Sequence, residues 1–259
     1  MADAQSGGGT RLLWTAGWDS TFRLLTTLLV RHKPVQPYYL IDPDRKSTPN
    51  ELRAMETIAD ALARQHPHAA GMLGKPIVSS VADLRPDSEI TGRFERLRAR
   101  SHLGGQYDWL ARFAKQQGLT DLELAIHVDD KAAAFLRQYV VIDGPPEDRY
   151  HRLMDDPPDE DLRLFDCFRF PVFDLTKRQM QAAARERGFL DLMELTWFCH
   201  LPTPDGRPCG RCNPCRYTIE EGLARRVPLN TRLRQHRKRI VQRIKQPLGA
   251  VARWAGLKK

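Results

Sequence analysis

The sequence predicts an α/β protein: a doubly wound, mostly parallel sheet, followed by a small metal-binding segment and a basic helical tail. Two observations favour this arrangement. Short apolar runs alternate along the chain with segments of helical periodicity, as in proteins whose parallel strands are joined by crossover helices. In addition, four of the five cysteines lie between residues 199 and 215, after the alternating region. We therefore expect three parts, over residues 10–190, 191–222 and 223–259.

Four strands and four helices follow from the pattern. The predicted strands cover residues 11–15, 35–41, 76–81 and 122–128. One predicted helix begins near residue 19, and three others cover residues 48–66, 106–117 and 177–187. The helix over 48–66 has a clear signal, because Leu52, Met55 and Ile58 follow the i, i+3, i+4 spacing of an amphipathic helix. Capping boxes are predicted at Thr48 with Glu51 and at Thr176 with Gln179.

One segment, 143–161, interrupts the alternation. It holds four prolines and eight acidic residues, which predicts an exposed loop or a lid. In parallel sheets, ligands bind beyond the carboxyl ends of the strands. An acidic residue lies near the carboxyl end of each predicted strand: Asp19, Asp42, Asp83 and Asp129. This edge of the sheet is therefore the expected site.

Length and composition place the chain among globular proteins. Its 259 residues are enough for one large domain with a small appendage, and the 41% of hydrophobic residues can form a substantial core. No apolar run approaches the ~20 residues of a membrane-spanning helix. The small, polar start does not have the pattern of a targeting segment, so we expect a cytoplasmic protein.

The net charge of +9 is unevenly distributed. From Gly222 to the end there are 12 basic residues and no acidic ones, which leaves 29 basic against 32 acidic residues in the rest of the chain. The basic tail predicts attraction to a polyanion or to an anionic membrane surface, or docking on a partner protein; a merely solvated tail is the alternative. We also expect a homo-oligomer.

The cysteine cluster has the spacing C-x9-C-x2-C-x2-C, formed by Cys199, Cys209, Cys212 and Cys215. Four thiolates this close suit a tetrahedral Zn²⁺, with Zn–S distances of about 2.3 Å, and an iron–sulfur cluster is the alternative. Disulfides are disfavoured, because there is no secretory signal and the last three cysteines are too close together to pair comfortably. We expect a structural zinc ion, since four thiolates leave no open coordination position. The fifth cysteine, Cys167, has aromatic neighbours and is expected to be a small buried apolar residue.

Residues 12–25, L-L-W-T-A-G-W-D-S-T-F-R-L-L, combine a strand end, a turn of small residues and a helix start. Backbone N–H groups at such a helix start bind anions. Gly17 allows the backbone to approach a ligand closely, and Asp19 is either a helix cap or a ligand for Mg²⁺. The run is not a G-x-x-x-x-G-K-[S/T] loop, which disfavours a kinase-like or GTPase-like site. An ordinary capped turn is the alternative.

Two separate runs resemble one family. T-A-G-W-D-S resembles the S-G-G-x-D-S loop of the PP-loop ATP pyrophosphatase superfamily. P-V-F-D-L-T-K-R-Q-M, and then T-W-F-C-H followed by P-C-G-R-C-N-P-C-R, resemble one branch of it, the 7-cyano-7-deazaguanine synthases. The likeness covers about residues 10–222 and is strongest at its two ends. It implies the HUP-type fold of PP-loop ATPases and a C-terminal zinc site.

The resemblance also implies a reaction. ATP adenylates a substrate carboxylate and pyrophosphate leaves; ammonia or an amine then displaces AMP to give an amide, or a nitrile after a second cycle. ATP is thus the implied substrate, bound with Mg²⁺, and the acceptor is a deazaguanine-like or another small or macromolecular carboxylate.

The resemblance assigns residues to these steps. The phosphates of ATP are assigned to the loop and the helix start: Thr15, Ala16, Gly17, Trp18, Asp19, Ser20 and Thr21. Lys177 is the implied second phosphate contact, and with Asp19 and Ser20 it forms the implied catalytic set. Ile41 and Asp42, at the end of the second predicted strand, are expected near the ribose or the adenine.

The chain departs from the family in its loop and in its central region. Thr15 and Ala16 replace the first Ser and Gly of the loop; Thr retains a hydroxyl, and Ala fits at low cost if its φ is negative. The family's substrate segments are replaced by residues around His102 and Leu103 and by V-D-D-K-A-A-A-F-L. Two other functions therefore stay open: an ATP-dependent RNA sulfur transferase with a cysteine-bound iron–sulfur cluster, and a non-catalytic nucleotide-binding module.

Overall fold

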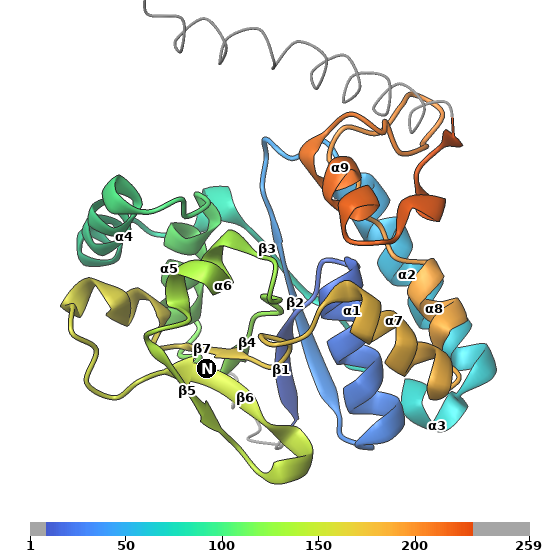
Figure 1. Cartoon of the computed structure of the whole chain (residues 1–259), viewed down its shortest axis with the longest axis horizontal. Helices are drawn as coiled ribbons and strands as arrows, with labels where there is room; N and C mark the ends of the chain where they lie inside the picture. Colours follow the sequence, from blue (N-terminus) through green and yellow to red (C-terminus); the bar gives the residue numbers. More distant parts are fainter. Residues whose placement is uncertain (1–8, 230–259) are drawn as a thin grey trace, which may run out of the picture. The chain divides into compact units, whose positions relative to one another are not determined.

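The computed structural model of the chain describes residues 9–229. The chain divides into two compact units, on either side of the bond between Trp197 and Phe198. The first unit contains the whole sheet and most of the helices (Figure 1). The second unit contains the four-cysteine segment. The two units are described separately below.

The first unit is built on a seven-stranded sheet with the order β3-β2-β1-β4-β7-β6-β5. The first five strands in this order are parallel, whereas β6 and β5 run antiparallel as a hairpin at one edge. The strands are β1 Thr10–Leu13, β2 Val35–Ile41, β3 Ile77–Ser80, β4 Leu122–Glu123, β5 Val140–Asp143, β6 Tyr150–Leu153 and β7 Phe168–Phe170. The predicted α/β class with a mostly parallel sheet is thus confirmed.

Helices cover both faces of this sheet (Figure 1). One face carries α1 Trp18–Leu25, α2 Thr48–Gln65, α3 Pro67–Ala70, α7 Lys177–Glu186 and α8 Leu190–Glu194. The other carries α4 Ser88–Arg100, α5 Gln106–Gln116 and α6 Lys131–Leu136. A π-helical stretch, Thr26–Val30, continues α1. No helix of the described residues is long and apolar enough to cross a membrane.

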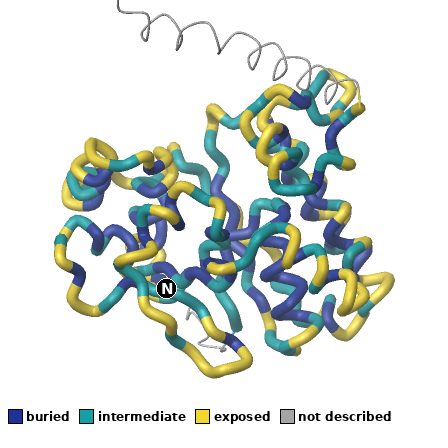
Figure 2. Tube along the Cα trace, viewed as in Figure 1, coloured by how far each residue is buried: buried dark blue, intermediate teal, exposed yellow. Residues whose placement is uncertain are grey.

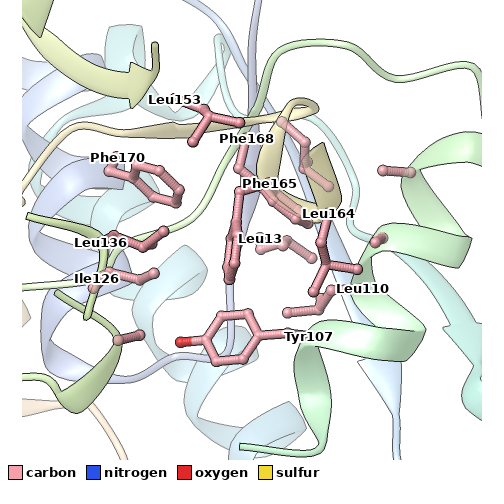
Figure 3. Close-up of a cluster of buried hydrophobic side chains, with 14 of the residues drawn as sticks. Leu13, Tyr107, Leu110, Ile126, Leu136, Leu153, Leu164, Phe165, Phe168 and Phe170 are labelled. Carbon is pink, nitrogen blue, oxygen red and sulfur yellow. The ribbon is translucent and has the colours of Figure 1, made fainter. Parts of the chain in front are cut away.

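The hydrophobic core explains why these strands are central. Leu13 lies on one face of β1, in a cluster with Leu110, Phe165 and Phe168 (Figure 3). Leu12 and Trp14, which alternate with Leu13, are fully buried as well. A strand buried on both faces reads as a continuous apolar run rather than an alternating one. The buried stretches accordingly concentrate along the central strands (Figure 2).

The helix ends test the two predicted capping boxes. The box at Thr176 and Gln179 is confirmed, because both reciprocal side-chain bonds are present at the start of α7. The box at Thr48 and Glu51 is wrong. The N-cap of α2 is Ser47, and the Glu51 carboxylate instead accepts hydrogen bonds from Ser47 Oγ at 2.6 Å and Tyr39 Oη at 2.9 Å. A buried carboxylate is costly unless it is hydrogen-bonded, so the Glu51 side chain bonds Ser47 and Tyr39 and does not cap the helix.

Two predicted segments differ in the structure. The strand predicted over 122–128 ends at Glu123, and the following residues form the loop that leads to α6. The acidic segment 143–161 is not merely a loop, since it contains β6 and so completes the hairpin with β5. Its prolines stand outside the ladder, where a missing N–H costs nothing.

The second unit begins at Phe198 and contains a single α-helix within the described residues, α9 Asn213–Glu220. A short 3₁₀ turn, Ala224–Arg226, follows it. The predicted basic tail over 223–259 lies mostly outside the described residues, which end at Leu229.

Candidate functional site

The sheet order places a switch point between β1 and β4. The chain proceeds from β1 to β2 and β3 on one side and then returns to β4 on the other side of β1. In open α/β sheets, ligands bind beyond the carboxyl ends of the strands at such a point. The segments that follow β1 and β4, residues 14–17 and 124–130, both lie at this edge.

The loop after β1 holds an unusual backbone conformation. Ala16 has φ of 51°, in the left-handed region. The negative φ at which alanine would fit this position at low cost is therefore not adopted, and the conformation costs a non-glycine residue about 1 kcal/mol. Two hydrogen bonds hold the loop: Trp14 N–H donates to Tyr38 O at 2.9 Å, and Trp197 N–H donates to Ala16 O at 2.8 Å.

Two residues that the resemblance assigns to the phosphates, Ser20 and Thr21, lie in α1, and their hydroxyls form hydrogen bonds within the protein. Ser20 is buried, and its Oγ accepts from Thr15 N–H and donates to Gly17 O, both at 3.4 Å. Thr21 is fully buried, and its Oγ1 accepts a hydrogen bond from Trp14 Nε1 at 3.0 Å. In this arrangement the two hydroxyls shape the turn. Trp18, at the start of α1, is also buried.

Asp19 and Lys177, which come from distant parts of the sequence, meet at this edge. The distance from Lys177 Nζ to Asp19 Oδ2 is 3.6 Å, and both side chains are mostly buried. Asp19 is in the first turn of α1, and Lys177 is the first residue of α7. The capping box of Thr176 fixes the start of α7 and so positions the lysine. The two helices pack against each other.

A histidine that sequence reasoning missed joins this pair. His127 is almost fully buried; its Nδ1 lies 3.0 Å from Asp130 Oδ2 and 3.8 Å from Asp19 Oδ2. Asp130 also accepts a hydrogen bond from His127 N–H at 3.2 Å. The ring nitrogen Nδ1 is thus within hydrogen-bond distance of Asp130 and faces the Asp19 carboxylate from farther away. The signal that could have found this histidine is the run H-V-D-D at the end of a predicted strand, of which only Asp129 is named from the sequence as a site residue.

Ile41 is the last residue of the neighbouring strand β2, and Asp42 follows it. The Asp42 carboxylate accepts the N–H of Asp44 at 3.0 Å, which stabilises a turn rather than pointing to a ligand. A buried network behind this turn joins Arg45 Nε to Glu51 Oε1 at 2.9 Å. Burial raises the pKa of Tyr39, which donates to the same carboxylate. These contacts hold the turn that follows β2 against α2.

The four cysteines of the second unit form a candidate metal centre. Their sulfur atoms all lie within 4.8 Å of one another. The Sγ–Sγ distances include 3.4 Å for Cys212 and Cys215, 3.9 Å for Cys199 and Cys212, and 4.0 Å for Cys209 and Cys215. A tetrahedral ion with bonds of about 2.3 Å requires sulfur separations of about 3.8 Å. The cluster therefore fits one metal ion of this kind, and none of its cysteines is in a disulfide.

Backbone N–H groups support these sulfurs as thiolates. Cys209 N–H donates to Cys199 Sγ at 3.1 Å, and Gly210 N–H donates to Cys215 Sγ at 3.2 Å. Gly210 has φ of 66°, a conformation that glycine adopts without strain, and it turns its N–H toward the sulfur. Donors of this kind are the outer shell of thiolate metal sites.

Two independent groups of residues thus stand out, a polar cluster at the switch point and a four-thiol cluster. No protein-family model matches this chain, and no curated protein matches it either. Function is therefore inferred from the geometry of these two groups.

Proposed function

We propose that this protein binds ATP at the switch point and activates a carboxylate by adenylation, after which ammonia or an amine displaces AMP. The acceptor is a deazaguanine-like acid or another carboxylate. The proposal combines the resemblance of the two sequence runs with the place where their residues lie.

The observation that carries the proposal is the ion pair of Asp19 and Lys177. Each was singled out from a different run of the sequence, and the two lie 3.6 Å apart at the edge where α/β sheets bind ligands. An aspartate and a lysine at this edge provide the two charges that ATP chemistry requires. The carboxylate attracts a magnesium ion, and the ammonium attracts phosphate oxygens.

The chemistry requires positioning and charge neutralisation more than covalent work by the protein. Asp19 would hold Mg²⁺, which neutralises phosphate charge. Lys177 would turn from Asp19 to the pyrophosphate as it leaves. The backbone N–H groups at the start of α1 would receive the remaining phosphate oxygens. His127, held by Asp130, would keep the Asp19 carboxylate in place.

We further propose that the four thiolates hold one structural Zn²⁺. Sulfur atoms within 4.8 Å of one another enclose a single ion, whereas an iron–sulfur cluster places irons and sulfides between its cysteines and separates them further. The compact geometry thus favours the ligase over the cluster-containing sulfur transferase. With four protein ligands, the ion supplies folding stability and no open position for substrate.

The test is a pyrophosphate-release assay with ATP, Mg²⁺ and ammonium, using carboxylated deazapurines and other acids as acceptors. We expect AMP and pyrophosphate in equal amounts. Asp19→Ala and Lys177→Ala should each lower turnover by about 100-fold or more, since each removes a charge that faces the phosphates.

Lys115→Ala is the matched control, because Lys115 also pairs with an aspartate, Asp87 at 2.7 Å, but lies on α5. It should leave turnover unchanged. Absence of pyrophosphate release with every acid, or release that survives in Asp19→Ala, would contradict the proposal. ATP binding without any turnover would instead support the non-catalytic module. Metal analysis that finds iron and acid-labile sulfide would contradict the zinc assignment.

A further inference from the structure

A polar pocket opens at the amino ends of the parallel strands, at the edge of the sheet opposite the switch point. It encloses about 470 Å³ and is lined by residues at the amino ends of strands, including Arg11 in β1, Lys33 before β2 and Asp121 before β4. The turn between β5 and β6, with Pro145 and Asp148, completes it. Its volume is within the range of small-molecule sites, about 300–1,000 Å³.

The floor of this pocket is formed by a buried arginine that is paired with two carboxylates. Arg23 and Glu123 are both buried; Arg23 Nε donates to Glu123 Oε2 at 2.6 Å, and Arg23 Nη1 donates to Asp148 Oδ1 at 2.9 Å. These charges satisfy one another. They hold the pocket's shape and leave recognition to the side chains at its mouth.

Three cationic side chains surround the mouth. Arg11, Lys33 and Arg169 are each between 38% and 45% exposed, whereas the two carboxylates beside them, Asp121 and Asp148, are 29% and 11% exposed. The accessible charge is therefore mainly positive. Arg11 pairs with Asp121 at 2.7 Å, and Lys33 pairs with Asp148 at 3.0 Å. Asp148 is also bound by Arg23 and Arg31, so it opposes an incoming anion only weakly, and the charge of Arg169 is in excess of these pairs.

Arg169 is held in place but has donors to spare. Its guanidinium lies over the Tyr150 ring, 4.7 Å from the centroid, and its closest carboxylate oxygen, Asp121 Oδ2, is 3.9 Å away. Within residues 9–229 this guanidinium makes no hydrogen bond. A stacked guanidinium with five unused N–H groups is pre-organised for bidentate binding of an oxyanion.

We propose that this pocket binds the phosphate group of a small organic phosphate, with Arg11, Lys33 and Arg169 as its partners. A phosphate has the charge and the number of oxygens to engage three cations, which a carboxylate does not. The pocket is larger than a phosphate group requires, and Tyr150 and Pro145 provide an apolar wall for an organic body. The site is separate from Asp19 and Lys177, and the inference does not depend on the proposed ATP chemistry.

Calorimetric titration of the full, metal-loaded chain with inorganic phosphate, at fixed ionic strength, tests the proposal. We expect saturable binding that Arg169→Gln weakens by about tenfold or more, the cost of losing charge-assisted hydrogen bonds. Lys177→Gln should retain this binding event, because Lys177 is at the other edge of the sheet. Acetate should bind more weakly than phosphate.

Arg137→Gln is the matched control, since Arg137 also stacks on a ring, Phe173 at 4.7 Å, and pairs with an aspartate outside the pocket. It should change phosphate affinity by less than twofold. The proposal is overturned if the wild-type chain shows no saturable binding, if binding is lost in Lys177→Gln and kept in Arg169→Gln, or if all three variants weaken it equally. Unchanged thermal melting of Arg169→Gln would show that a loss of binding is not a loss of folding.

Discussion

Removal of the buried Arg23 charge is the most informative perturbation of the first unit. Arg23, on α1, binds Glu123 of β4 through two nitrogens and Asp148 of the hairpin turn through a third. Arg23→Met retains an apolar side chain of similar length but leaves the Glu123 carboxylate buried without its cation. Asp148 keeps Lys33 at 3.0 Å, so Glu123 carries most of the effect.

The expected cost is large relative to the stability of a domain. Removing one partner of a buried ion pair costs about 3–5 kcal/mol, against a total stability of about 5–15 kcal/mol. Burial already raises the pKa of Glu123, although the Arg23 guanidinium acts in the opposite direction. The charged carboxylate is thus disfavoured at this position even with its partner. Arg23→Met combined with Glu123→Leu should therefore regain all but about 1 kcal/mol.

Urea unfolding at neutral pH, followed by tryptophan fluorescence, measures these changes. Four of the five tryptophans (Trp14, Trp18, Trp109 and Trp197) belong to the first unit, so the signal reports on it. Arg96→Met, which breaks an exposed pair with Asp161, is the control and should not move the midpoint. A cost below about 1 kcal/mol for Arg23→Met, or a double variant less stable than Arg23→Met alone, would refute the reasoning.

Two further predictions concern the glycines and the thiols. Gly105→Ala should stabilise the protein by about 0.5 kcal/mol, because a Cβ there meets nothing within 4 Å, and Gly118→Ala should cost about 1 kcal/mol because its φ is +64°. Gly144→Ala should cost at least about 2 kcal/mol, since its φ is +86° and the new Cβ lies 2.7 Å from Asp148 O; equal urea midpoints for all three would contradict this. After chelation of the metal at pH 8, a thiol reagent should react with four cysteines and spare Cys167, whose pKa burial raises to about 12. As the pH rises from about 9 toward 12, the Cys167 thiol should become reactive, and the stability that its burial as a neutral thiol contributes should be lost. Rapid reaction of all five cysteines in the folded protein at pH 8 would contradict the burial of Cys167.

The sequence predicts individual strands and helices of this fold better than it predicts which strands pair with one another. β2 covers the predicted residues 35–41, because an apolar run between Pro34 and Asp42 has few alternatives. The sequence does not predict the hairpin of β5 and β6, because the prolines and acidic residues of segment 143–161 are typical of a loop. Within this segment, β6 forms a strand through its pairing with β7. Pairing of this kind is a tertiary property that a local pattern does not contain.

The same limit applies to the site. Asp19 and Lys177 were found because each lies in a recognisable run, and the Cys cluster because its spacing is short. His127 and Asp130 were not found, since their role depends on how the segment after β4 passes the start of α1. Ala16, which has a left-handed φ, likewise accepts a hydrogen bond from Trp197, which is distant in the sequence.

The position of β1 at the centre of the sheet has a consequence for synthesis of the chain. β1 can pair with β2 soon after both are synthesised, but its other neighbour, β4, is far along the chain; Arg11 and its partner Asp121 are 110 residues apart. Contacts this distant form slowly and late. On the ribosome, the loop after β1 must wait for β4, α7 and Trp197 before its hydrogen bonds are complete. The residues of this loop are thus among the last of the first unit to reach their final conformation, although they are synthesised well before β4.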